Sequence, residues 1–220
     1  LWMTSESESI LQSTNIQVTL PATPKTCFTE LKVSESRKHA QRYGRLGIGV
    51  KRPFLFERFG RPLAYYGYHE QIENDVFMRP CAKDLKNKDL LNFFKPMNRE
   101  PNILNYDFYS ESEWRIIYIK ELLTRKLIVN PRDSKNEVEY NYFKSLKAEQ
   151  QEKLKYLIPL DGWFAMIIYP SLDVKNKAQQ NSSENISEKI QKIKNLEDHG
   201  NSVENRNWPI EVDLDACRHF

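Results

Sequence analysis

The sequence predicts an α+β protein, a single domain in which a mixed, mostly antiparallel sheet is covered by peripheral helices. Short apolar runs rich in strand-forming residues alternate with short helical patterns from residue 25 onward. The run at 114–119 is apolar on both faces apart from Arg115, which is typical of a central strand. Hydrophobic residues make up 40% of the chain and charged residues 29%, so a wholly disordered chain is excluded.

The expected strands are short runs of apolar or alternating residues that end at Gly, Pro or polar positions. They lie at residues 16–20, 26–31, 46–50, 62–68, 114–119, 125–130, 163–169 and 209–214. The fourth expected strand carries Leu63 and Tyr65 on one face. The third contains Gly47 and Gly49, which indicate the close approach of another backbone or of a ligand.

The expected helices are short and carry recognisable ends. One begins after Ser34, a good N-cap, and ends before Gly44, which suits a left-handed C-cap. Another begins near Pro53 and ends at Gly60. The first of these helices spans 35–43, and further helices are expected at 84–94, 139–156 and 186–196.

The predicted domain spans residues 25–220. Residues 1–24 precede it as a weakly structured segment, because they are polar and acidic at first and are then interrupted by Pro21 and Pro24. Residues 171–207 are polar and rich in Asn, Lys and Glu, and we expect them to form a mobile insertion.

Composition and motifs exclude several classes of protein. No apolar run approaches the ~18 residues that a membrane-spanning helix needs, so no membrane partner is expected. The three cysteines are widely spaced and the four histidines do not cluster, so neither a disulfide framework nor a metal site is expected. Few cysteines and no signal segment favour a reducing, cytoplasmic location. The sequence has no phosphate-binding glycine loop and no nucleophile-elbow or kinase motif.

Positive charge is concentrated in one segment of a chain whose net charge is only +3. The segment from residue 34 to residue 61 contains eight Lys and Arg residues and only two acidic residues, Glu35 and Glu57. The eight are Arg37, Lys38, Arg42, Arg45, Lys51, Arg52, Arg58 and Arg61. Such a face attracts an acidic protein or the phosphates of a nucleic acid. The alternative is a solvated surface whose long side chains cover apolar residues.

Two carboxylates, Glu111 and Glu113, precede the expected central strand. At strand spacing both side chains point to the same side, where like charges raise one another's pKa and favour acid–base chemistry or stabilisation of an oxocarbenium ion. The structural alternative is that Glu113 pairs with Arg115 and orders the edge of the sheet. His39 and Tyr43, one helical turn apart, form a second candidate site for a nucleotide or an acidic group.

Four places in the chain stand out by their order and spacing. They are CFTEL at 27–31 with His39, YGRLGIG at 43–49 and GRPLAY at 60–65; FKPM at 94–97; ESEWR at 111–115; and the stretch from PI at 209–210 to DACRHF at 215–220. In this arrangement the chain, from Cys27 to Phe220, resembles the AbiGi family of bacterial abortive-infection proteins.

The resemblance implies a cytoplasmic protein of phage defence that uses no cofactor and acts as the antitoxin partner of a nucleotidyltransferase-like toxin. It also implies an upstream segment with a His-aromatic-Thr start. That segment is not found, and the Leu1 start leads us to expect that it was lost, together with any activity that needs it.

A second similarity concerns the carboxylate pair. ADP-ribosyltransferases carry a Glu or Gln two residues before a catalytic Glu at the entry to a strand. By this similarity Glu113 would hold the nicotinamide ribose of NAD and Glu111 would address the acceptor. The two interpretations differ in where Glu113 lies: in an open cleft near His39 and Tyr43, or against a buried arginine.

Overall fold

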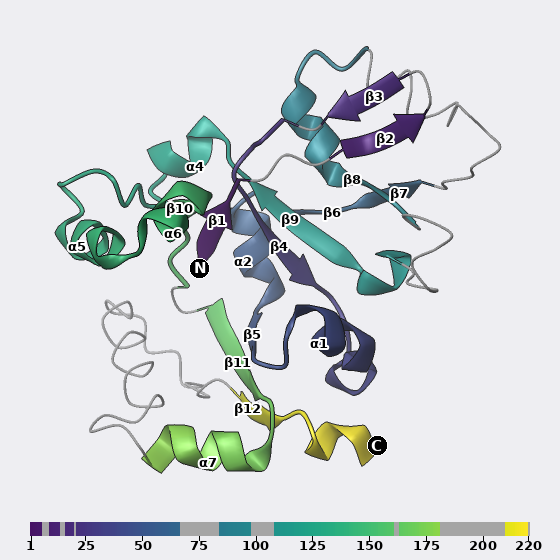
Figure 1. Ribbon diagram of the computed structural model, residues 1–220, viewed down its shortest axis with the longest axis vertical. Helices are drawn as coiled ribbons and strands as arrows, with labels where there is room; N and C mark the ends of the chain where they lie inside the picture. The colour runs from purple at the N-terminus through teal and green to yellow at the C-terminus, as the bar shows by residue number, and fades with distance from the viewer. Residues whose placement is uncertain are drawn as a thin grey trace. The chain divides into compact units, whose positions relative to one another are not determined.

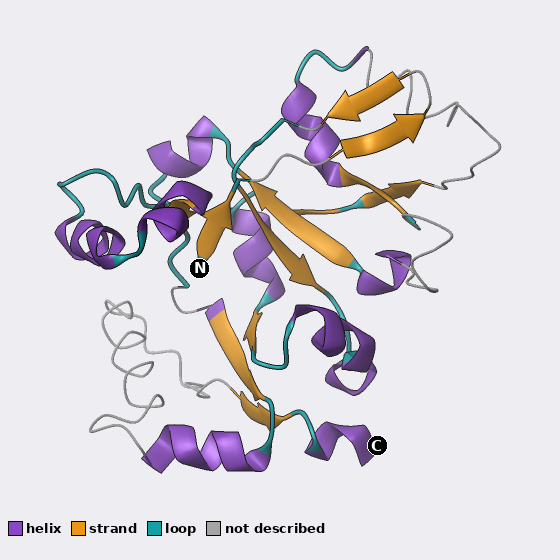
Figure 2. Cartoon of the chain, viewed as in Figure 1, coloured by secondary structure: helices purple, strands orange, loops and turns teal. Residues whose placement is uncertain are grey.

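The computed structural model describes residues 1–5, 9–13, 16–19, 21–66, 84–97, 108–160, 163–180 and 210–219 (Figure 1). Helices accompany several small sheets with mostly antiparallel pairing, which confirms the predicted α+β class (Figure 2). The fold forms two compact units, each made of two stretches of chain. Unit 1 comprises Leu1–Glu30 and Leu55–Pro159, and unit 2 comprises Leu31–Phe54 and Leu160–Phe220.

Unit 1 contains a five-stranded antiparallel sheet in the order β10-β1-β4-β9-β6. Its strands are β1 Trp2–Thr4, β4 Lys25–Thr29, β6 Arg61–Pro62, β9 Glu113–Ile117 and β10 Leu154–Leu157. β9 lies between β4 and β6, as the apolar run at 114–119 predicts.

The two faces of β9 have different chemistry because successive side chains of a strand point to opposite sides. Ile116 is fully buried on one face, and Glu113 and Arg115 lie on the other. The apolar core of unit 1 consists of Met3, Leu55, Leu63, Tyr66, Leu91, Phe108, Ile116, Ile117, Leu122, Ile128, Phe143 and Ile158. The sheet therefore offers a polar, charged face to the elements that cover it.

Two further strand pairs belong to unit 1. β2 Ser9–Ser13 and β3 Ile16–Thr19 pair antiparallel, and β7 Ala64–Tyr66 and β8 Phe94–Pro96 pair parallel. The single strand expected at 62–68 is divided, because β6 pairs with β9 whereas β7 pairs with β8. The Leu63 N–H between them donates to the carbonyl of Glu113.

The helices of unit 1 are short and differ most from expectation. They are η2 Lys88–Phe93, η3 Phe108–Glu111, α4 Lys120–Thr124, α5 Glu137–Ser145 and α6 Ala148–Lys153, with α2 Arg52–Glu57 at the boundary between the units. The helix expected at 139–156 is wrong as one element. Leu146 is extended and ends α5, and α6 gives way to β10, which pairs with β1.

One more prediction in unit 1 is wrong, and another is correct only in part. The residues expected to form a strand at 125–130 follow the end of α4 as a turn and a bend, and only Val129 among them bridges to a strand, at Leu157. The helix expected at 84–94 is for the most part the 3₁₀ helix η2, whose end runs directly into β8. In both places apolar residues contact distant parts of the chain, a relation that local periodicity does not contain.

Unit 2 is built on a three-stranded sheet in the order β12-β11-β5. β5 Gly47–Val50 pairs antiparallel with β11 Phe164–Tyr169, and β12 Ile210–Asp213 pairs parallel with β11. All three strands were predicted. The accompanying helices are η1 Val33–Glu35, α1 Arg37–Tyr43, α7 Leu172–Gln180 and η5 Ala216–His219.

Glycines explain two local features of unit 2. α1 begins two residues later than expected, after η1, and ends at Gly44 with φ 107°, a conformation that favours glycine. A Cβ on Gly49 would lie 2.8 Å from the Cβ of Met166 on β11. The close approach that Gly49 permits is therefore that of the neighbouring strand.

Some expectations fall outside the described residues, including the helix at 186–196 and the beginning of the 209–214 strand. Within residues 1–24 the structure contains β1, β2 and β3, while the proposed domain start at residue 25 remains a prediction. In the described part of the chain, no helix is long and apolar enough to cross a bilayer.

Candidate functional site

The carboxylate pair lies where η3 meets β9. Glu111 ends η3 and Glu113 begins β9, and Ser112 between them has a left-handed backbone, with φ 46°. This turn directs both side chains inward, where Glu111 is 2% exposed and Glu113 is 6% exposed. The pair predicted from spacing is thus brought together in the interior of unit 1.

A lysine that sequence reasoning missed joins the two carboxylates. Lys95, in the middle of β8, places its Nζ 2.6 Å from Oε2 of Glu111 and 2.5 Å from Oε2 of Glu113. Arg115 donates from Nε to Oε1 of Glu113 at 2.6 Å. We call these four residues the Lys95 cluster. It contains the Glu113–Arg115 pair that the structural interpretation of the motif anticipates.

Hydrogen bonds extend the Lys95 cluster toward η2. Arg115 also donates to the carbonyl of Asn92 at 2.7 Å, and the Asn92 side chain accepts from Nζ of the buried Lys25 at 3.3 Å. Asn92 donates in turn to Thr23, whose hydroxyl donates to Asp89. Buried polar groups are stable in a protein interior when they are paired in this way.

The pKa values in the Lys95 cluster reflect this pairing. Burial favours the neutral form of Glu113, but the Arg115 guanidinium and the Lys95 ammonium outweigh it and hold the pKa of Glu113 below its ordinary value. Tyr65 on β7 accepts the N–H of Glu113 at 2.9 Å, and burial raises the pKa of Tyr65 to about 12. Glu113 is therefore ionised, and Tyr65 neutral, near pH 7.

The sequence contained one signal for Lys95. It is the polar residue of the FKPM motif, with Phe94 and Pro96 beside it, but its meeting with Glu111 and Glu113 depends on the packing of β8 against η3 and β9. Arg115 was found from sequence because it lies on the same strand as Glu113, two residues away.

The second predicted pair lies in unit 2. The rings of His39 and Tyr43 are 4.5 Å apart on α1, and Arg42 lies 5.5 Å above the Tyr43 ring. His39 is half-buried, whereas Tyr43 is 54% exposed. Only Tyr43 of this pair presents most of its ring to solvent.

The basic residues between 34 and 61 do not share one environment. Arg37, Lys38, Arg42, Lys51, Arg52 and Arg61 are exposed. Arg45 is also exposed and pairs with Asp215 at 2.5 Å. Arg58 is an exception at 1% exposed, and it donates to the carbonyl of Pro159.

Exposed apolar side chains accompany the basic ones on α1 and β5. Tyr43, Leu46 and Ile48 are 54%, 68% and 49% exposed. We define the α1–β5 surface as Arg37, Lys38, Arg42, Tyr43, Leu46 and Ile48. Large exposed apolar residues among charges are typical of protein interaction sites.

A metal centre has no counterpart in the ranges that the structure covers. No group of three or more His, Cys, Asp or Glu side chains there is placed to hold a metal ion. The Lys95 cluster has two carboxylates, but their oxygens already contact cationic side chains.

Comparison with protein families identifies the chain. A family model described as "Putative abortive phage resistance protein AbiGi, antitoxin" matches residues 2–160. The chain belongs to the AbiGi family. This membership supports an antitoxin-type role in abortive phage resistance. No match was found among curated proteins or among solved structures.

The extent of the AbiGi match differs from the expected one. The match begins at residue 2, upstream of the first motif at 27–31, and ends at residue 160. The motif at 209–220 therefore lies outside it and does not contribute to the family assignment. Both the Lys95 cluster and the α1–β5 surface lie inside the matched range.

Proposed function

We propose that this AbiGi protein acts in the cytoplasm as an antitoxin that binds a toxin protein through the α1–β5 surface. The family match over residues 2–160 carries the proposal. The exposed cations of α1 and the exposed Tyr43, Leu46 and Ile48 support this location. The cations favour a partner with an acidic surface, and the apolar residues supply the area that binding buries.

The Lys95 cluster supports a binding role over a catalytic one. A general acid or base must exchange protons with a substrate, but Glu113 contacts two cationic side chains and its pKa is lowered. Breaking a buried charge cluster costs folding free energy, so these residues stabilise the sheet on which the rest of unit 1 is built.

Co-expression with a candidate toxin from a neighbouring gene tests the proposal. The full chain should rescue growth and should copurify with the toxin. The triple variant Arg37→Glu/Lys38→Glu/Arg42→Glu should lose both properties, because it reverses three charges of the α1–β5 surface.

The matched control is Lys120→Glu/Lys135→Glu/Lys147→Glu, which reverses three exposed lysines of unit 1. It should bind and rescue like the wild type. Equal binding by the two triple variants would rule out the α1–β5 surface. The absence of both copurification and rescue with the wild-type chain would rule out the antitoxin function itself.

NAD-dependent ADP-ribosyl transfer is the enzymatic alternative, because Glu111 and Glu113 stand at a strand entry in the spacing of that class. It is tested by NAD consumption with wild type and Glu113→Gln. Turnover that the variant loses, while a folded control retains it, would replace the binding proposal. No turnover in either protein would leave Glu113 as a structural residue.

Nucleic-acid binding is the third alternative, and it shares the basic residues Arg37, Arg42 and Arg45. Reversing these charges should then weaken binding and reduce its dependence on salt concentration. An unchanged affinity and an unchanged salt slope would remove this alternative.

A further inference from the structure

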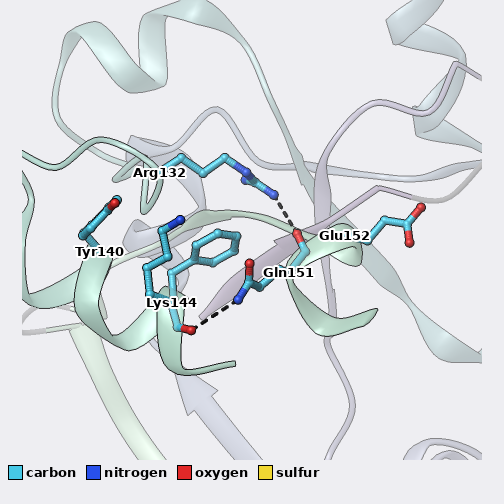
Figure 3. A pocket seen from close by; sticks show the side chains of 6 residues that line it. Arg132, Tyr140, Lys144, Gln151 and Glu152 are labelled. Carbon is cyan, nitrogen blue, oxygen red and sulfur yellow. Dashed lines mark hydrogen bonds between the residues drawn. The ribbon is translucent and has the colours of Figure 1, made fainter. Parts of the chain in front are cut away.

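A pocket of about 440 Å³ opens between α5 and α6 of unit 1 (Figure 3), and no residue of the Lys95 cluster lines it. Its lining consists of Arg132, Tyr140, Phe143, Lys144, Gln151 and Glu152. Tyr140, Phe143 and Lys144 share one face of α5 because they are three and four residues apart. Pockets that hold small molecules have volumes of about 300–1,000 Å³.

Internal contacts hold the walls of this pocket in place. The Arg132 guanidinium donates to the carbonyls of Gln151, Leu154 and Lys155 at 2.7, 2.9 and 3.0 Å, and so caps the end of α6. It also lies 4.6 Å from the centre of the Phe143 ring. Arg132 is thus a positioning residue that fixes α6 against α5.

Gln151 joins the same two helices from the other side. Its Nε2 donates to the carbonyl of Leu146 at 2.8 Å and to that of Lys144 at 3.4 Å. Both of these carbonyls lie at the end of α5. Because its amide nitrogen is held in this way, Gln151 keeps its Oε1 as an acceptor at the pocket (Figure 3).

Lys144 is the cation that the pocket leaves available. Its Nζ lies 5.5 Å from the centre of the Tyr140 ring, and no carboxylate among the described residues pairs with it. The Tyr140 hydroxyl and the Gln151 Oε1 likewise have no hydrogen-bond partner within the described ranges. Glu152 extends away from the other lining residues in Figure 3.

This combination specifies the chemistry of a ligand. The Lys144 ammonium group attracts an anionic group, and the Tyr140 ring favours a flat ring. An amide oxygen accepts an N–H of the same ligand. We propose that this pocket binds a small ligand that joins a flat, N–H-bearing ring or group to an anionic group. Nucleoside monophosphates and tryptophan both have this chemistry.

Ligand-observed NMR titration of the full chain tests the site. The probes are adenosine monophosphate, L-tryptophan, and the fragments adenosine and inorganic phosphate. One of the two complete probes should bind saturably. If it is adenosine monophosphate, its two fragments should bind about tenfold more weakly than the whole, since each lacks half of the contacts. Binding of adenosine monophosphate assigns the nucleotide, and binding of tryptophan assigns the amino acid.

Variants decide whether binding occurs in this pocket. Lys144→Gln should weaken binding about tenfold, because a charge-assisted hydrogen bond is lost. Lys144→Arg should retain it, and Tyr140→Leu, which removes the ring, should weaken it about fivefold. Lys135→Gln is the matched control, an exposed lysine that does not line the pocket, and should bind like the wild type.

Three results would overturn the proposal: no saturable binding of either complete probe, binding that Lys144→Gln and Tyr140→Leu leave unchanged, or an equal loss in Lys135→Gln. A thermal melt of each variant identifies any that fails to fold. Lys144 is exposed, so Lys144→Gln should melt with the wild type.

Discussion

In unit 1, the buried Glu113 pairs with the buried Arg115 and with Lys95, which is largely covered. In unit 2, by contrast, the cations Arg37, Lys38 and Arg42 lie in solvent beside exposed apolar residues. Both sets contain lysine and arginine, but burial gives these side chains different roles. A buried charge without its partner costs several kcal/mol, while an exposed one costs almost nothing. The first set stabilises the fold, and the second is suited to recognition.

The largest expected effect comes from removing the charge of Glu113, in the buried set of this comparison. Glu113→Gln should lower the free energy of unfolding by about 3–5 kcal/mol, because Arg115 and Lys95 each lose a partner in the interior. Urea unfolding at pH 7 measures the change. Glu35→Gln, which removes the exposed partner of Lys32, is the control and should cost less than about 0.5 kcal/mol.

Glu113→Gln should also change how the stability of the protein depends on pH. Because the pKa of Glu113 is lower in the folded protein than its ordinary value of 4.5, its contribution is present above pH 4.5 and is lost as pH falls through the folded value. The wild type should therefore lose stability in acid more steeply than Glu113→Gln. Parallel acid profiles for the two proteins would contradict an ionised, paired Glu113.

The next largest effect concerns the close contact between β5, which carries part of the α1–β5 surface, and β11. Gly49→Ala should lower the stability of unit 2 by about 1–3 kcal/mol, because the new Cβ would lie 2.8 Å from that of Met166. Gly47→Ala is the matched control. Its nearest contact is the flexible end of Ile168 at 3.2 Å, so a smaller loss is expected. Thermal unfolding of both variants checks the order, and equal losses would contradict it.

Tyr65→Phe sharpens the description of the Lys95 cluster. It removes the acceptor of the Glu113 N–H and should cost about 1 kcal/mol. Because burial raises the pKa of Tyr65 from 10 to about 12, its hydroxyl stabilises the fold below pH 10 and this contribution is lost as pH rises through 12. The difference in stability between wild type and variant should shrink over that interval, as measured by urea unfolding.

The smallest expected effect on stability tests the exposed half of the comparison. Arg37→Glu/Lys38→Glu/Arg42→Glu should change the free energy of unfolding by less than about 1 kcal/mol, because all three side chains lie in solvent. A loss of several kcal/mol would show that these cations support the fold. In that case the loss of toxin binding by the same variant would no longer indicate a contact.

The elements that the sequence predicted correctly are those whose pattern is local. β4, β9 and β11 combine apolar runs with strand-forming residues, and β5 is flanked by the turn at Gly44. The failures involve pairing over distance. Residues 154–157 continue a helical pattern, but they form β10 because they pair with β1, which lies far from them in the sequence.

The site follows the same division. Glu111, Glu113 and Arg115 are neighbours in sequence, so their juxtaposition could be predicted. Lys95 enters from β8, and no local feature of the FKPM motif indicates which carboxylates it meets. The pocket between α5 and α6 was missed for a related reason, since a single helix was expected over both.

The pairing of β5 with β11 has a consequence for the order of synthesis. Ile48 pairs with Ile167, which lies far along the chain. Because synthesis runs from the N-terminus, α1 and β5 leave the ribosome well before β11 exists. At about 5–20 residues per second the delay is on the order of ten seconds. During that interval β5 lacks its only strand neighbour among the described residues. The strand that carries part of the proposed recognition surface is thus paired late, after all of unit 1 has been translated.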